Sequence, residues 1–240
     1  MTQTVDVHAS TRTRLLEAAA QLLAESSGSQ ITTRAICELA GVQAPTLYHH
    51  FGDKQGLLDA VAAYGFEQYL NAKRANKPSE DPFADIRLGW DRHTDFALAN
   101  PALYAVMYGQ VVPGKRPAAA ADAEALLLAS LTRAAEKGRL TTTPDSAAHL
   151  ILATNIGVAL ALITTPPGQR DATLSDRTRD AVLAAITAPD TPTTTTTTDT
   201  NRSAISRNAI ALHATLTNPT PPLSTTETAL LKDWLRRLAD

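Results

Sequence analysis

One stretch, residues 31–58, limits what this 240-residue chain can fold into, because it contains two short helical patterns separated by a glycine. In the first pattern, Ile36, Leu39 and Ala40 occupy positions i, i+3 and i+4. This spacing places them on one face of a helix, which we expect from about residue 33 to residue 40. The glycine that follows predicts a sharp turn there instead of one long helix.

The residues at the helix ends also favour two short helices. The hydroxyl group of Thr32 or Thr33 can accept a hydrogen bond from an unpaired N–H group at the start of the first helix. Gly41 can adopt the left-handed backbone that ends this helix. Pro45 suits the first turn of a second helix, about 44–50, where its missing N–H group is no loss. These features predict a helix-turn-helix, whose second helix would lie in the DNA major groove.

The second helix has an inner and an outer face. Leu47 and Phe51 are expected to face inward, which leaves polar side chains outward. The outward residues are Gln43, Thr46, Tyr48, His49 and His50. A pair of packed helices in an ordinary helical domain is the alternative interpretation, because two-helix hairpins are common and short motifs give false positives. The motif alone does not decide between the two.

The segments around the turn are distinctive. Ile-Thr-Thr-x-x-Ile precedes it, Ala-Gly-Val forms it, and Thr-Leu-Tyr-His-His-Phe-x-x-Lys-x-x-Leu-Leu follows it. These residues resemble the TetR family of bacterial one-component transcriptional regulators, closely over about residues 12–61 and only in architecture beyond. The resemblance implies an all-α fold, with an N-terminal helix-turn-helix three-helix domain and a C-terminal helical ligand-binding and dimerisation domain.

The resemblance also implies partners. A homodimer would bind double-stranded DNA at an inverted-repeat operator and act as a repressor, released by a small, mostly apolar effector. Tyr48 and Lys54 would contact phosphates, although both could be plain surface residues. Gln43, Thr46 and His49 would read base edges. The full set of expected DNA-binding residues is Thr33, Arg34, Gln43, Ala44, Pro45, Thr46, Tyr48, His49 and Lys54.

Net charge gives the weakest support for DNA binding. The whole chain has a formal charge of −2, and residues 1–60 hold four Lys and Arg against six Asp and Glu residues. A basic footprint, the usual electrostatic signature of nucleic-acid binding, is missing. Helix N-termini, hydroxyl groups and a few placed cations can still bind phosphates, so we expect a modest salt dependence. The acidic N-terminal part also allows a helix-turn-helix that contacts only protein.

Composition narrows the class of protein. Only 5% of the chain is aromatic, and no window has the alternation of a strand ladder, so helices are favoured. The single cysteine, Cys37, excludes an internal disulfide framework and suits small-residue packing in a reducing compartment. No signal pattern is present, and no run approaches the ~18 to 20 apolar residues of a membrane span. We therefore expect a soluble, cytoplasmic protein without membrane contact.

Residues for catalysis or metal binding are not evident. His49 and His50 are adjacent and diverge by ~100° on a helix, which makes a poor metal pair, and the other histidines lack ligand spacing. The chain has no glycine-rich phosphate loop, nucleophile elbow or acidic pair in an apolar setting. We expect no metal, no cofactor and no enzymatic activity; an enzyme that uses the helical cavity is the remaining alternative.

The chain is expected to divide into five segments. These are a disordered arm (1–10), a helix-turn-helix DNA-binding domain (11–56), an effector-binding and dimerisation domain (57–188), a Thr-rich linker (189–202) and a C-terminal helical extension (203–240). Further helices are expected over about 11–26, 53–73, 83–99, 102–108, 118–137, 145–164, 174–187, 203–216 and 225–238.

An effector pocket is expected in the second domain. Its candidate lining residues are Trp90, His93, Phe96, Tyr104, Met107 and Tyr108. We expect two or three of the six in the pocket, because aromatic stripes at helical spacing belong mostly to cores. Asn155, polar within an apolar helix, is either a pocket residue or an interface residue satisfied across the dimer. His93 or Asn155 would supply the main polar contact.

The helix over 145–164 is apolar on nearly every face, so it must be buried on both sides. One side would face the domain core and the other a second subunit. Together with the helix over 174–187, it would form a four-helix bundle between subunits. Val158 and Leu162 are the candidate residues for facing the partner, and the C-terminal helices around Trp234 are the alternative interface.

Overall fold

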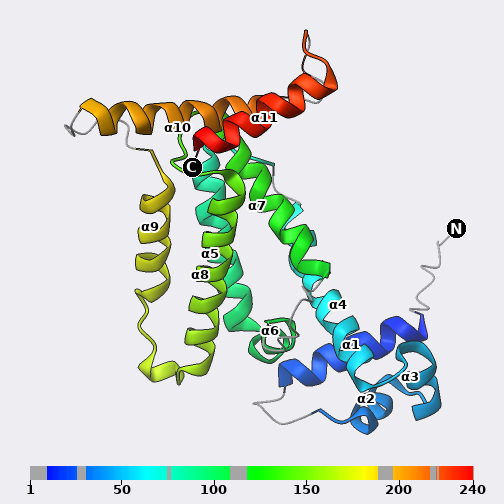
Figure 1. Ribbon diagram of the computed structural model, residues 1–240. Helices are drawn as coiled ribbons and strands as arrows, with labels where there is room; N and C mark the ends of the chain where they lie inside the picture. Colours follow the sequence, from blue (N-terminus) through cyan, green and yellow to red (C-terminus); the bar gives the residue numbers. More distant parts are fainter. Residues whose placement is uncertain are drawn as a thin grey trace, which may run out of the picture. The chain divides into compact units, whose positions relative to one another are not determined.

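The computed structural model describes residues 10–25, 31–74, 77–108, 118–188, 197–216, 220 and 222–239. These residues form helices (Figure 1), with no strand among them apart from one isolated bridge between Leu140 and Thr187. The predicted all-α fold is confirmed. The helices are α1 (Thr11–Glu25), α2 (Thr33–Ala40), α3 (Ala44–Phe51), α4 (Lys54–Arg74), α5 (Pro82–Ala99), α6 (Pro101–Tyr108), α7 (Ala118–Glu136), α8 (Pro144–Thr164), the 3-10 helix η1 (Pro167–Gln169), α9 (Leu174–Ile186), α10 (Thr197–Thr215) and α11 (Thr225–Ala239).

The expected helix boundaries agree with the structure to within about two residues, with one exception. α10 begins at Thr197, although we expected a Thr-rich linker as far as residue 202. Threonine costs only a few tenths of a kcal/mol relative to ordinary helix formers, so a run of it can extend a helix that its neighbours nucleate. The remainder of the expected linker, 189–196, and residues 1–9 of the expected arm lie outside the described residues.

The chain packs into two compact units. Unit 1 comprises Met1–Ala75 and Phe96–Asp122, and unit 2 comprises Asn76–Asp95 and Ala123–Asp240. α5 therefore contributes residues to both units. These units are defined by packing, and the division into functional segments stays a prediction.

Unit 1 is organised around α1, which packs against α2, α3, α4 and α6. α6 also packs along α4, where a Cβ atom added to Gly65 would lie 2.7 Å from Leu103 Cδ2. The absence of a side chain at Gly65 is thus what lets the two helices approach so closely. The buried apolar side chains of unit 1 include Leu15, Leu16, Ala19, Ile36, Leu47, Leu57, Val61, Leu103 and Tyr104.

Unit 2 has an apolar core that includes side chains of α5, α7, α8 and α9, and it has ion pairs at its edges. The Arg133 guanidinium on α7 contacts the Asp85 carboxylate on α5 at 2.9 Å, and Arg179 on α9 contacts Asp91 on α5. These ion pairs connect α7 and α9 to α5. The buried apolar side chains of the same helices supply most of the stability of unit 2. The buried apolar residues include Phe83, Ile86, Trp90, Leu131, Ala134, Leu140, Ala148, Ile151, Leu183 and Ile186.

α8 corrects the expectation that no segment approaches the length of a membrane span. It is long and apolar enough to cross a bilayer, with a mean hydropathy of 1.9 over an 18-residue window. This is weak evidence for a membrane span, because the core helix of a soluble protein has the same composition. α8 packs against α9 and buries 39% of that window inside the chain.

The turn between α2 and α3 gives a first prediction. Gly41 has φ of 65°, a conformation that costs an L-residue about 1–2 kcal/mol. Gly41→Ala should therefore lower the free energy of unfolding by about 1 kcal/mol, measured by urea denaturation. Gly168→Ala is the matched control, because Gly168 does not have positive φ and a Cβ atom there meets nothing within 4 Å. Equal stability of the two variants would contradict the strain at Gly41.

Candidate DNA-binding interface

Helices α2 and α3 of the helix-turn-helix begin and end close to the residues that the sequence predicted. Thr32, and not Thr33, caps α2: its hydroxyl oxygen accepts a hydrogen bond from the Ala35 N–H group at 3.2 Å. Gly41 ends α2 in the left-handed conformation. Gln43 precedes α3 in extended backbone, and Gly52, with φ of 78°, ends it. The turn and both helix ends are therefore fixed by local chemistry.

The buried face of α2 differs from the expected one. Ile36 and Ala40 are buried as expected, but Leu39 is 46% exposed and Cys37 is buried in its place. Burial, followed by the nearby Glu38 carboxylate, raises the pKa of the Cys37 thiol. Cys37 is therefore a protonated packing residue, and Leu39 adds an apolar side chain to the outer surface of the motif.

Two arginines of α1 hold the motif together. The Arg14 guanidinium donates a hydrogen bond to the Ala40 carbonyl oxygen, and its Nη2 lies 3.3 Å from the Gly41 carbonyl oxygen. The positive group thus meets the negative end of the α2 dipole. Arg12 lies over the Phe51 ring, 5.4 Å from its centroid, at the end of α3. Both cations of α1 are engaged in positioning α2 and α3.

None of the nine expected DNA-binding residues is buried. Seven are exposed, and Thr33 and Thr46 are half-buried. They lie on α2, on α3 with the Gln43 that precedes it, and on the first residue of α4, which are neighbouring segments of unit 1 (Figure 1). Leu47 is completely buried and anchors α3, while Tyr48 beside it is 46% exposed. Helix α3 therefore exposes polar side chains on its outer face, while Leu47 on its inner face anchors it to the core.

Charge at this surface is low. The Arg34 side chain pairs with Glu38 at 2.8 Å, and the hydrogen bond and the charge of Glu38 raise the pKa of Arg34. Lys54 is exposed at the start of α4, next to Asp53, whose carboxylate accepts the Gly56 N–H group at 2.7 Å. Arg34 would have to exchange Glu38 for a phosphate, whereas Lys54 has no ion-pair partner among the described residues.

The expected effector-pocket residues fall in both compact units. Tyr104, Met107, Phe96 and Tyr108 belong to unit 1, where the Tyr104 and Tyr108 ring centroids lie 4.6 Å apart. Tyr104 and Met107 are buried, and the other two are half-buried. Trp90, His93 and Asn155 belong to unit 2 and are buried. The pocket itself stays a prediction.

The buried Asn155 side chain forms a hydrogen bond within its own chain. Its Nδ2 donates to Thr94 Oγ1 at 3.2 Å, and the Thr94 hydroxyl in turn donates to the Trp90 carbonyl oxygen at 3.2 Å. The Trp90 indole N–H group donates to Ser175 Oγ at 3.0 Å. This network joins α5, α8 and α9, so the Asn155 amide does not need a partner across a dimer. A contact of Asn155 with an effector would replace or extend this network.

Comparison with known proteins supports the interpretation of the motif. Residues 15–61 match the family model described as bacterial regulatory proteins, tetR family. The match covers all of α2 and α3 and the buried positions of α1 that support them. Over these residues the chain has the sequence of a TetR-family N-terminal domain. The match ends at residue 61. It therefore gives no information about the function of residues 62–240.

Among curated relatives, the HTH-type transcriptional regulator UidR of Escherichia coli K12 is 37% identical over 60 residues. That match covers 25% of this chain and 31% of UidR, so the chain spans about a third of the length of this relative.

Solved structures extend the likeness to the second domain. A protein with unknown function from Rhodococcus sp. RHA1 has a TM-score of 0.60 at 26% identity and covers 78% of this chain and 100% of that chain. A TetR variant from Acinetobacter baumannii AYE in complex with minocycline has a TM-score of 0.55 at 21% identity, with coverage of 71% and 92%. The second of these likenesses shows the fold alone.

Proposed function

We propose that this TetR-family chain is a cytoplasmic transcriptional repressor that binds an inverted-repeat operator as a homodimer and is released by a small, mostly apolar effector. The observation that carries the proposal is the outer face of α3. Its polar side chains are exposed, while Leu47 on the opposite face is completely buried. A short helix held in this way can enter the major groove without disturbing its own core.

The side chains of α3 suit direct readout of bases. The Gln43 side chain makes no capping hydrogen bond to its own helix, which leaves its amide available for a base edge. A glutamine amide can form paired hydrogen bonds with adenine, and the Thr46 methyl and hydroxyl groups suit thymine or a polar edge. Tyr48 and Lys54 would fix the register of the helix by contacting phosphates, which carry no sequence information themselves.

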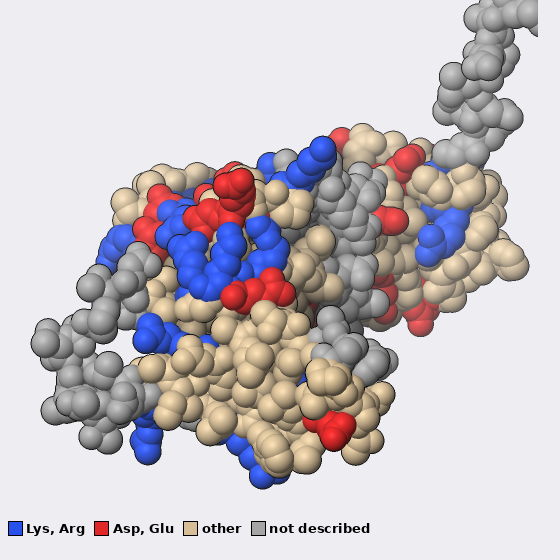
Figure 2. Space-filling view, turned by 90° about the horizontal axis from the view of Figure 1, so that it is seen from above, with Lys and Arg blue, Asp and Glu red and all other residues tan. Residues whose placement is uncertain are grey.

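Electrostatics should contribute less to affinity than in most DNA-binding proteins. Residues 1–60, which include α2 and α3, hold four Lys and Arg residues against six Asp and Glu residues. On another face, seen from above the view of Figure 1, Lys and Arg side chains likewise lie beside Asp and Glu side chains (Figure 2). With few phosphate contacts, the affinity should fall only shallowly with salt, because each neutralised phosphate adds a slope of about −0.9. Specific contacts from α3 would therefore supply a large share of the binding free energy.

Dimerisation is proposed through α8 and α9, with a correction to the residues involved. Val158 and Leu162 do not face a partner, because both are buried inside the single chain. The exposed stripe of α8 instead contains Ala153, Gly157 and Ala161, spaced four residues apart. A Cβ atom at Gly157 would meet nothing within 4 Å. Small residues at this spacing let two helices pack closely, as at the centre of a four-helix bundle.

The neighbouring helix has a matching surface. On α9, Ala181, Ala184 and Ala185 are exposed, while Val182 and Leu183 are buried against the unit core. α8 and α9 pack against each other, so their exposed small residues can form one continuous surface. The apolar composition of α8 is then explained without a membrane, because one side faces the core and the other the partner.

Effector release is proposed to act through α6. This helix buries Leu103, Tyr104 and Met107 and packs against both α1 and α4. Because α1 holds the end of α2 through Arg14, and α4 begins at Lys54, a shift of α6 would move two supports of α3. A ligand that prefers the shifted state by ~1–3 kcal/mol would weaken DNA binding roughly 5- to 150-fold.

The Acinetobacter baumannii TetR structure was solved with minocycline, which supports a search for a ligand in the helical domain here too. The expected lining residues remain Trp90, His93, Phe96, Tyr104, Met107, Tyr108 and Asn155. A screen of apolar small molecules, scored by loss of DNA binding, tests this part. If no compound that binds the protein changes its affinity for DNA, effector release is wrong.

The proposal predicts distinct effects of two kinds of substitution. In a gel-shift assay with DNA from upstream of its own gene, Tyr48→Phe and Lys54→Ala should each weaken binding by a similar factor, about tenfold or less, on every bound sequence. Thr46→Ala and His49→Ala should weaken binding to some sequences more than to others. Leu39→Ala is the control, because Leu39 is exposed and was not expected among the DNA contacts. A protein that binds only other proteins would show no shift for any sequence.

A further prediction concerns the dimer. Ala153→Glu and Gly157→Glu should place charges in the proposed contact between subunits and give monomers in analytical ultracentrifugation, with loss of operator binding. Ala129→Glu on α7 is the matched control, because Ala129 is also an exposed helical alanine and lies outside this surface. All three variants should keep their helical circular dichroism spectrum. If the α8 variants remain dimeric, the subunits associate through another surface.

A further inference from the structure

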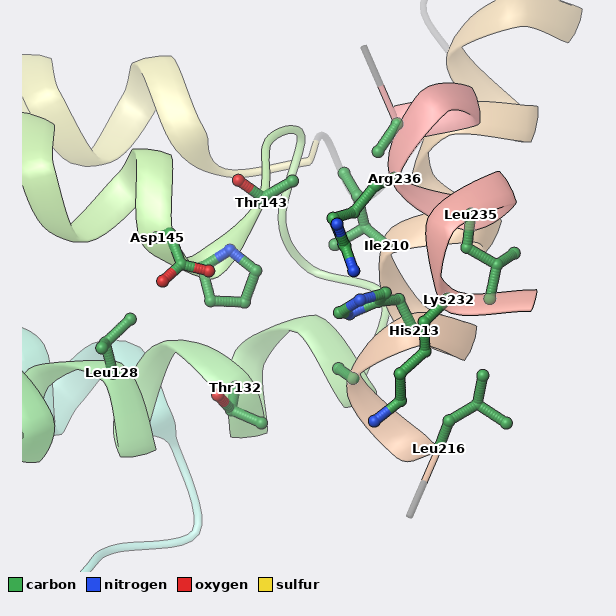
Figure 3. A pocket seen from close by; sticks show the side chains of 13 residues that line it. Leu128, Thr132, Thr143, Asp145, Ile210, His213, Leu216, Lys232, Leu235 and Arg236 are labelled. Carbon is green, nitrogen blue, oxygen red and sulfur yellow. The ribbon is translucent and has the colours of Figure 1, made fainter. Parts of the chain in front are cut away.

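A cavity in unit 2 lies apart from the residues discussed above. It has a volume of about 510 Å³ and is bounded by α7, the start of α8, and the C-terminal helices α10 and α11 (Figure 3). This volume falls within the range of about 300–1,000 Å³ that is usual for small-molecule sites. None of the expected effector-pocket residues lines it, so it would be a separate site.

The walls of the cavity are largely apolar. Leu128 of α7, Ile210 of α10, Leu216 just after α10, and Leu235 of α11 line it, and Ile210 and Leu235 are buried. These aliphatic side chains come from helices that are far apart in the sequence, so the lining exists only in the folded unit. An occupant would need an apolar body to replace water against these side chains.

Nitrogen-bearing side chains gather at one side of the cavity. His213 of α10 and Lys232 and Arg236 of α11 extend into it, and Asp145 of α8 lies on the opposite side (Figure 3). Asp233, which is 3.9 Å from Arg236, forms a shorter pair with Arg237 at 2.8 Å. Lys232 has no ion-pair partner among the described residues.

With His213 neutral, the lining side chains carry two positive charges and one negative charge. Charge complementarity therefore favours one negative charge on an occupant. The start of α8 is a less favourable place for this group, because the Asp145 carboxylate there would repel an anion. The anionic group would thus lie against α10 and α11, near Lys232 and Arg236.

We propose that this cavity binds an apolar small molecule that carries a single anionic group, such as a carboxylate. The apolar part lies against Leu128, Ile210 and Leu235, and the anionic group contacts Lys232 and Arg236. Because α10 and α11 form one wall and α7 and α8 the other, the ligand ties the C-terminal extension to the helices beneath it. Binding to the folded state alone raises stability with ligand concentration.

His213 gives the site a pH dependence. Burial, followed by the charges of Lys232 and Arg236, lowers the pKa of His213 below its ordinary value of 6.5, and Asp145 opposes this. α7 contributes no titratable lining residue. An anion bound beside His213 would raise that pKa, so the complex takes up a proton and the affinity for the anion increases as the pH falls through the raised pKa. In His213→Gln this dependence should disappear.

The test uses calorimetry on the full chain with octanoate, octanol and octylammonium, which share one apolar body and differ in charge. Octanoate should bind saturably, at least about tenfold more tightly than octylammonium. The double variant Lys232→Met with Arg236→Met should lose about tenfold or more of the octanoate affinity and little of the octanol affinity. Ala214→Trp, which fills the cavity, should weaken both.

Arg237→Met is the matched control, because Arg237 neighbours Arg236 on α11 but does not line the cavity. It should bind octanoate like the unchanged protein, and circular dichroism should report the same helix content for every variant. Three results would each overturn the proposal: no saturable binding of octanoate, equal binding of octylammonium, or an equal loss in Arg237→Met. None of them bears on DNA binding by α3.

Discussion

The arrangement of the proposed DNA-binding surface depends on the turn at Gly41 and on Arg14, which holds the end of α2 at this turn. Gly41 adopts a left-handed backbone at φ of 65°, which sets the direction in which α3 leaves α2. Arg14 donates to the carbonyl group of Ala40, so α1 fixes the end of α2 at this point. Leu47 then buries the inner face of α3. The exposure of Gln43 and Tyr48 follows from these three constraints.

The sequence could predict the helix ends, because these depend on interactions between residues that are close together in the chain. The cap at Thr32, the glycine at the end of α2 and the proline in the first turn of α3 each act within a few residues, and each lies where the pattern indicated. Equally local chemistry begins α11, where Ser224 and Glu227 form a reciprocal capping pair. Helix boundaries were therefore accessible from the sequence, and the family resemblance added the expected contacts of α3 with DNA.

The features that could not be predicted depend on packing between distant segments. At ~100° per residue, Cys37 lies about 60° from Ala40 and Leu39 about 60° from Ile36, on opposite sides of that pair, so the helical pattern could not decide which is buried. On α8, which is apolar all round, no pattern could show that Val158 faces the core and Gly157 is exposed. The cavity beside α10 and α11 is likewise assembled from four helices, and no local motif indicates it.

The central claim is that α3 of two subunits reads DNA with two-fold symmetry. Selection of bound sequences from a random DNA pool by the purified chain tests it most directly. The account predicts an enriched inverted repeat whose half-sites are related by the dimer axis and whose centres lie about one helical turn, or a multiple of it, apart. Enrichment of a single asymmetric half-site, or of no sequence at all, would contradict it.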